Sequence, residues 1–215
     1  LVYGNLPWLV ALSIGLSAWV LGALFEDVLV KTRHASTRWV GLKKLTPSYW
    51  GMQLGHIGLV MVVLGVALTS HYSVEKDVRL APGETLTVGD YVFRFDGVED
   101  HRGPNYTAQR GTLVVSSGPW SEVLHPEKRI YRVQQNPMTE AAITGTLWRD
   151  LYVALGEPLD NGAWAVRVYV KPMVRWMWFG ALVMALGALM SLLDKRYRHR
   201  VSAAPTQRAN AGAAT

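Results

Sequence analysis

The side chain best suited to chemistry in this sequence is His56, which lies in the run GMQLGHIG at residues 51–58. An ionisable group inside an apolar segment of membrane length is costly, so a functional role is a hypothesis to consider first. A neutral imidazole is also a common axial ligand of haem iron. The alternative is a neutral histidine that donates to a carbonyl of a neighbouring helix and holds a bundle together. Spacing alone leaves both interpretations open and favours the structural one.

The other chemistry-bearing residues are weaker candidates. His71 lies at the outer end of the same apolar segment. The remaining histidines lie in polar surroundings that are typical of solvated side chains, and they are His34, His101, His125 and His199. The chain contains no cysteine, which excludes a cysteine nucleophile, a thiolate metal site, an iron–sulfur cluster and covalent haem attachment through C-x-x-C-H within this chain. The Walker A, G-x-S-x-G and H-E-x-x-H patterns are also absent. We assign no catalytic residue from the sequence.

Three apolar stretches must position His56, and they cover residues 6–25, 49–70 and 176–193. The first and the third carry no charged side chain, and the second has only Gln53 and His56 as strongly polar members. At about 1.5 Å per residue the first stretch rises roughly 30 Å, the thickness of the hydrocarbon core of a bilayer. We therefore predict three transmembrane helices.

The charge distribution gives these helices an orientation. The net charge of +6 would suggest an anionic partner if it covered one surface, but it is concentrated in the segments 31–48 and 194–215, each with five basic residues. The long segment 71–175 holds 12 basic and 13 acidic residues. By the positive-inside rule the loop and the tail are cytoplasmic, and the long segment lies on the other side of the membrane, which in a bacterium would be the periplasm. The charge therefore reports topology, and we expect no nucleic-acid partner.

The outer segment is predicted to be all-β. Aromatic side chains occupy every second position at Tyr91, Phe93 and Phe95, and this period of two is typical of a half-buried strand. Turn-forming clusters recur at 81–83, 88–90, 102–105, 117–119 and 160–162. Candidate strands lie near 107–115, 130–134, 151–155 and 163–170. We expect a small sandwich or barrel of about six to eight strands that folds without disulfides.

The predicted fold class is an α-helical membrane protein with three transmembrane helices and an inserted all-β periplasmic domain. The expected organisation is residues 1–30 with the first membrane helix at about 6–25, a basic cytoplasmic loop at 31–48, the second membrane helix with His56 at 49–70, a periplasmic β domain at 71–175, the third membrane helix at 176–193, and a basic cytoplasmic tail at 194–215 that is disordered at its end.

Glycines mark one face of the second membrane helix. At 100° per residue they cluster within about 80° of one another, opposite His56, and they are Gly51, Gly55, Gly58 and Gly65. Such a groove lets a neighbouring helix approach closely. The other side is then free to face a pocket, and its members are Tyr49, Met52, Gln53, His56, Val60 and Val63. The polar runs at 102–106, 126–131, 137–141 and 149–158 are either ion-paired loop corners or a docking face.

Several uncommon motifs, taken in order, resemble the C-terminal part of the CcmF family, the haem lyase subunit of the multicomponent cytochrome c maturation pathway. They are GHIG, SVEKDVRLAPGE, RGPNY, PEKRIY, MTEAAI, RDLYVALGEP, KPMVRW and DKRYR, and they cover nearly the whole chain. The resemblance implies a multi-pass protein of the bacterial inner membrane.

The resemblance also implies partners and a cofactor. In that family a longer membrane protein accepts haem from a periplasmic CcmE-type chaperone. With a CcmH-type apocytochrome-binding subunit, it directs thioether formation on apocytochrome c. The family also carries a haem b inside the membrane, held by a histidine pair and supplied with electrons by quinol. His56 matches one member of that pair, so the resemblance makes it an axial ligand of the haem iron.

The family's tryptophan-rich haem-binding segment, the periplasmic histidines that flank it and the other membrane haem ligand lie upstream of the matched part. We therefore expect a C-terminal fragment or the C-terminal product of a split protein, which would not perform the lyase reaction alone. Two alternatives stay open. One is a membrane-tethered docking module without a cofactor, and the other is part of a haem transport path, although three helices with one buried polar site are few for a transporter.

Overall fold

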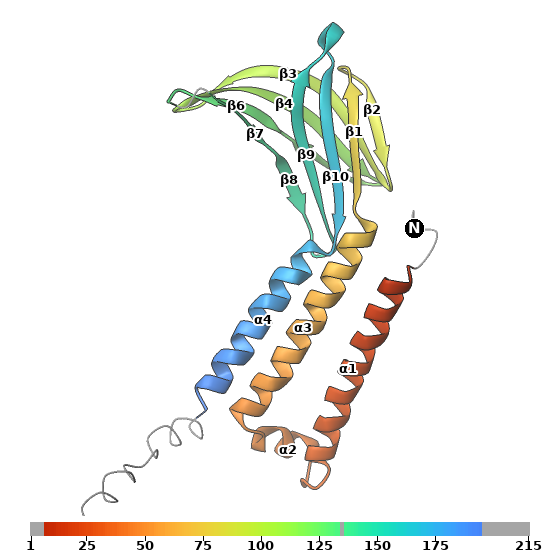
Figure 1. Cartoon of the computed structure of the whole chain (residues 1–215), viewed down its shortest axis with the longest axis vertical. Coiled ribbons are helices and arrows are strands. Elements are labelled where there is room, and N and C mark those ends of the chain that lie inside the picture. Colours follow the sequence, from red (N-terminus) through yellow and green to blue (C-terminus); the bar gives the residue numbers. More distant parts are fainter. Residues whose placement is uncertain (1–6, 134–135, 195–215) are drawn as a thin grey trace, which may run out of the picture. The chain divides into compact units, whose positions relative to one another are not determined.

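The computed structural model describes residues 7–133 and 136–194, so the expectation of a disordered tail end lies outside the described residues. Three helices in the described part are long and apolar enough to cross a membrane (Figure 1), namely α1 (Trp8–Thr32), α3 (Pro47–Tyr72) and α4 (Val174–Leu192). α3 begins where the Thr46 hydroxyl accepts the backbone N–H of Tyr49 at 3.2 Å. Pro47 takes the first helical position, where a missing N–H costs nothing. The three predicted spans are confirmed as helices of suitable length and composition.

A fourth, short helix lies in the basic segment, where no helix was predicted. α2 (Arg38–Lys44) is capped by Thr37, whose side chain accepts the backbone N–H of Val40 at 3.4 Å. A Cβ at Gly41 would lie 2.9 Å from the Cβ of Thr32, so glycine permits a close contact with the end of α1. Seven residues are too few for a helical period to be recognised in the sequence.

Glycines bring α3 and α4 into backbone contact. A Cβ at Gly58 would lie 2.5 Å from the carbonyl oxygen of Gly180, and a Cβ at Gly187 would lie 2.5 Å from that of Gly51. Side chains at these positions would force the helices apart. The predicted groove is therefore confirmed, except that a Cβ at Gly55 would meet no atom within 4 Å.

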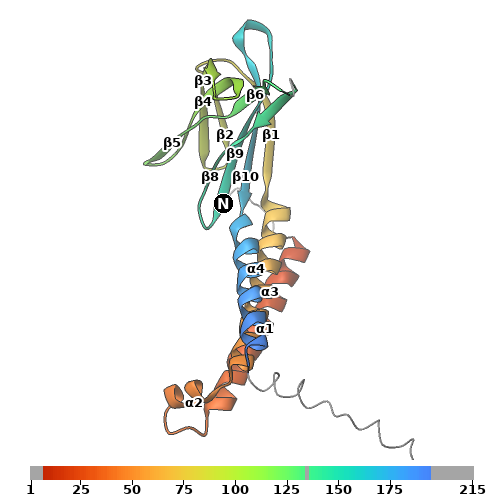
Figure 2. The same cartoon turned by 90° about the vertical axis from the view of Figure 1, so that its left-hand side faces the viewer.

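Ten strands follow α3 in the described part of the chain. They are β1 (Val74–Leu80), β2 (Thr85–Val88), β3 (Tyr91–Arg102), β4 (Tyr106–Ser117), β5 (Trp120–Leu124), β6 (Glu127–Tyr131), β7 (Pro137–Glu140), β8 (Ala142–Gly145), β9 (Arg149–Pro158) and β10 (Trp164–Pro172). One antiparallel sheet has the order β1-β10-β9-β8, and the other has the order β2-β3-β4-β6-β7 with β5 paired to β4. Figure 2 shows these two layers. The sandwich is thus the correct one of the two predicted architectures.

The core lies between the two sheets, and its largest side chains are all completely buried. They are Phe93, Phe95, Leu113, Leu151 and Leu155. Each contributes about 1.5–3 kcal/mol by leaving water. In β3 the residues on either side of each of these phenylalanines are exposed. The predicted alternation at 91–95 is therefore confirmed, and it directs Phe93 and Phe95 into the core.

The prediction of six to eight strands was wrong because several strands carry a weak signal. β7 and β8 have four residues each, and β1 has the sequence VEKDVRL, with charges on its exposed face. The runs at 126–131 and 149–158 contain the strands β6 and β9 rather than loop corners. Their charged residues pair with neighbours, so they do not mark turns.

Candidate functional site

His56 is fixed by a hydrogen bond to its own helix. The ring is exposed, and Nδ1 lies 2.9 Å from the carbonyl oxygen of Met52. A carbonyl oxygen can only accept, so Nδ1 carries the proton in this contact. In the neutral ring Nε2 then keeps its lone pair, which is the form of imidazole that binds a metal ion. A hydrogen bond from the other nitrogen is also the usual way in which a ligating histidine is oriented.

His56 belongs to an exposed stripe along α3, which is otherwise apolar. Met52, Leu59, Val63 and Val66 are 37–49% exposed and lie three or four residues apart, in series with His56. This spacing puts all five side chains on one face of the helix. An apolar face with one oriented imidazole suits a flat, apolar, metal-containing group or another membrane helix.

Two residues predicted for the same free face are buried instead. Gln53 is 3% exposed and Val60 is 6% exposed. The side-chain amide of Gln53 donates to the Tyr49 hydroxyl at 2.6 Å and to the Leu24 carbonyl of α1 at 3.4 Å. The helical period shows which residues share a face, but it does not show where α1 packs. The free face is therefore narrower than the sequence predicted.

The described residues do not place His56 in a cluster of metal-binding side chains. Within residues 7–133 and 136–194 there is no group of three or more histidine, aspartate or glutamate side chains that could hold a metal ion. His71 is exposed further along α3, about 22 Å away by helical rise. The Nδ1 of His125 lies 3.4 Å from the Thr112 hydroxyl, and the His101 ring lies 6.5 Å from that of Tyr106.

The β domain holds a charged cluster that includes two residues of the polar run 126–131, for which the sequence left ion pairing and docking open. Glu127 is buried and accepts hydrogen bonds from Arg110 Nε at 2.6 Å and from Arg129 Nε at 2.7 Å. Burial raises the pKa of Glu127, but the hydrogen bonds from the two arginines outweigh it, so that this pKa lies below its usual value. The bond to Glu127 in turn raises the pKa of Arg129. The cluster joins β4 to β6, and the E-x-R spacing at 127–129 was its only signal in the sequence.

Another contact, which the sequence did not predict, joins the two sheets. The guanidinium carbon of Arg149, at the start of β9, lies 4.6 Å from the ring centroid of Tyr91 and 4.5 Å from that of Trp120. Its Nε also donates to the Tyr91 hydroxyl at 2.8 Å. Cation–π contacts of this type contribute about 0.5–2 kcal/mol each. The partners are non-local, so no local sequence pattern could have revealed them.

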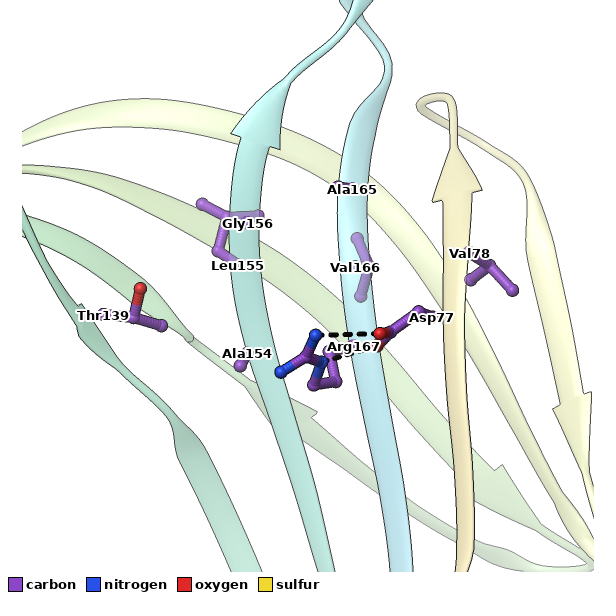
Figure 3. A pocket seen from close by; sticks show the side chains of 9 residues that line it. All are labelled: Asp77, Val78, Thr139, Ala154, Leu155, Gly156, Ala165, Val166 and Arg167. Atoms are coloured by element: carbon purple, nitrogen blue, oxygen red, sulfur yellow. Dashed lines mark hydrogen bonds and ion pairs between the residues drawn. The ribbon is translucent and has the colours of Figure 1, made fainter.

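An open cavity of about 490 Å³ is lined by residues of β1, β9 and β10 and by Thr139 of β7, and Figure 3 labels them. Arg167 and Asp77 point toward each other there, with hydrogen bonds of 2.6 and 2.8 Å. The bond from Arg167 lowers the pKa of Asp77. The two charges satisfy one another, and the described lining holds no nucleophile beside a base. We therefore assign no catalytic role to this cavity.

Several known proteins are similar to this chain in sequence or in architecture. The family model described as the CcmF C-terminal beta-sandwich matches residues 71–172. The cytochrome c-type biogenesis protein CcmF of Pseudomonas aeruginosa is 53% identical over 200 residues, which are 93% of this chain and 30% of that protein. Its counterpart in Escherichia coli K12 is 42% identical over 206 residues, which are 92% of this chain and 31% of that protein. A solved structure of the cytochrome c haem lyase CcmF matches 89% of this chain and 31% of its own with a TM-score of 0.72, at 20% identity.

Three helices of membrane length with a β-sandwich inserted before the last of them define a membrane protein with a folded domain between two spans. The chain belongs to the CcmF family and matches the C-terminal part of its members, as the resemblance predicted. It spans about 30% of the length of the curated relatives that it matches.

Proposed function

We propose that this chain is the C-terminal portion of a cytochrome c-type biogenesis protein, a haem lyase subunit of the bacterial inner membrane that supports covalent attachment of haem to apocytochrome c. The family match and the relatives' names support this proposal. The observation that carries the chain's own role is His56, whose Nδ1 is bound to the Met52 carbonyl on an exposed apolar stripe.

In this proposal His56 is one axial ligand of an intramembrane haem b, through Nε2. Haem supplies one-electron redox chemistry when it is bound. The residues present fit such a group, because Leu59 and Val63 offer aliphatic surface beside the imidazole. The hydrogen bond to Met52 fixes the orientation of the ring and makes the Nε2 lone pair a stronger ligand for iron. Close packing of Gly58 against Gly180 fixes the helix that presents the ligand.

The proposed topology places the β domain in the periplasm and both basic segments in the cytoplasm, since their charge follows the positive-inside rule. The proposed partners are a CcmE-type haem chaperone, a CcmH-type subunit and apocytochrome c, with quinol as the electron source. The relatives' role in cytochrome c biogenesis supports this set of partners.

The ligand role can be tested by His56→Ala in the full-length protein, with His71→Ala as the matched control on the same helix. Because loss of an axial imidazole removes a direct bond to iron, we expect the haem content of purified His56→Ala to fall at least about tenfold. His71→Ala should leave it unchanged. The measurement is the reduced absorption spectrum of b-type haem per mole of protein.

A second variant covers the case in which His56→Ala does not accumulate. His56→Met keeps a ligand to iron, so we expect retained haem with a raised midpoint potential. Unchanged haem content and potential in both variants would contradict the ligand role. That result would favour a membrane-tethered docking module without a cofactor.

A further inference from the structure

The turn between β8 and β9 exposes two large apolar side chains. Leu147 is 53% exposed and Trp148 is 62% exposed. Tight turns in water normally carry glycine, asparagine, aspartate or serine. This turn is nevertheless well built, because the Thr146 N–H donates to the Arg149 carbonyl at 2.8 Å. The Thr146 hydroxyl accepts the N–H groups of Trp148 and Arg149 at 3.3 and 3.2 Å. Below, residues 146–149 are called the Leu-Trp turn.

The Leu-Trp turn is attached to the first residues of α4. Met173, which has a left-handed backbone conformation with φ 59°, donates its N–H to the Trp148 carbonyl at 2.9 Å. The ring of Trp148 lies 5.6 Å from that of Trp176. Arg175 donates to the buried Asp150 carboxylate at 3.1 Å, directly after the turn. Residues 64–177 belong to one compact unit, so these contacts place the turn beside the start of α4.

The start of α4 indicates what covers the Leu-Trp turn. α4 is one of the helices of membrane length, and its first turn therefore lies where the bilayer meets water. Tryptophan is enriched at that level, and arginine extends its head group toward water there. The pairing of Trp148 with Trp176 carries this aromatic belt from the helix onto the β domain.

We propose that the Leu-Trp turn inserts into the boundary between lipid head groups and acyl chains. It thereby anchors the β domain to the bilayer surface at a third point, in addition to the covalent connections through α3 and α4. Phospholipid covers this apolar surface, because the exposed side chains of Leu147 and Trp148 continue the interfacial belt of a membrane span. This inference does not depend on the proposed role in cytochrome c biogenesis.

The absence of cysteine allows a single reporter group to be placed in the chain. We would attach a polarity-sensitive fluorophore to Leu147→Cys and reconstitute the whole chain in vesicles of phosphatidylcholine and phosphatidylglycerol. Spin-labelled lipids quench a probe inside the bilayer, and iodide quenches one in water. Because interfacial segments insert about 5–10 Å, we expect lipid quenching at least about twofold stronger than for the control.

The matched control is Val133→Cys, at an apolar residue that is 94% exposed. Val133 lies near the first residue of β4, because the preceding Arg132 donates its N–H to the Asn105 carbonyl. The Leu-Trp turn lies near the last residue of β4, because Arg149 contacts Trp120, which pairs with Ser117. The two ends of β4 are separated by roughly 36 Å of strand.

A probe at residue 147 that iodide quenches as strongly as the control would show that the turn lies in water. A probe protected from both quenchers would show that protein covers it. Either result would overturn the proposal. Trp148→Cys supplies a second label that must agree, and an unchanged unfolding midpoint establishes that each labelled variant is folded.

Discussion

At the level of single residues, two kinds of ion pair in the β domain differ in how strongly they hold it. The Glu127 side chain is 5% exposed and lies between Arg110 and Arg129. Asp77 and Arg167 pair at a similar distance, but their side chains are 56% and 52% exposed. Water screens the exposed pair, which therefore contributes little. A buried charge that loses its partner is costly.

We therefore predict that Glu127→Gln lowers the free energy of unfolding by about 3 kcal/mol at neutral pH. The measurement is denaturant unfolding of the detergent-solubilised chain, followed by near-UV circular dichroism. Asp77→Asn is the control and should change the unfolding midpoint little. Equal effects of the two substitutions would be evidence against a stabilising role for the buried cluster.

The same cluster predicts a dependence on pH. The pKa of Glu127 is lowered in the folded protein, so its stabilising effect is complete above the ordinary carboxyl value of 4.5 and is lost as the pH falls through the lower, folded value. The difference in stability between the native chain and Glu127→Gln should therefore shrink below about pH 4.5. A difference that stayed constant down to the acid transition would contradict this assignment.

At the level of elements, α3 and α4 approach each other closely because glycines, which have no side chain, lie where the two helices cross. A Cβ at Gly58 would lie 2.5 Å from the carbonyl oxygen of Gly180 and 2.7 Å from the Cγ of Met184. The first of these atoms belongs to the backbone and cannot move without moving the helix. One methyl group at Gly58 should therefore separate the two helices.

We predict that Gly58→Ala destabilises the helices by about 1–3 kcal/mol, as overpacking generally does. Gly55→Ala is the matched control, because its methyl group would meet no atom within 4 Å. The thermal unfolding midpoint in detergent, recorded by far-UV circular dichroism, should fall for the first variant and stay the same or rise for the second. Indistinguishable midpoints would show that the helices do not touch at Gly58.

At the level of the whole molecule, the basic segments and the β domain should lie on opposite sides of the membrane. Ser36 and Ser121 are exposed residues of the same type, one in the basic loop and one on β5. In intact cells an impermeant maleimide should label Ser121→Cys and not Ser36→Cys, because basic loops stay in the cytoplasm. Labelling of both after lysis is the control. Labelling of Ser36→Cys in intact cells would reverse the proposed orientation.

The sequence by itself determined the features that depend on local composition and period. The apolar lengths predicted three spans, the alternation at Tyr91, Phe93 and Phe95 predicted a strand with a buried face, and the turn clusters separated the longer strands. The uncommon motifs between residues 55 and 198, taken together and in order, predicted the family. These features can be predicted from the sequence because each depends on residues that are close together in the chain.

Only the tertiary structure decided which faces meet. It buried Gln53 against α1 while His56 stayed exposed, although both lie in the same polar part of one helix. It also joined Arg149 to Tyr91 across the two sheets, and it placed Trp148 beside Trp176. A period shows that residues share a face, but the partner of that face lies far away in the chain, and its position depends on packing of the whole fold.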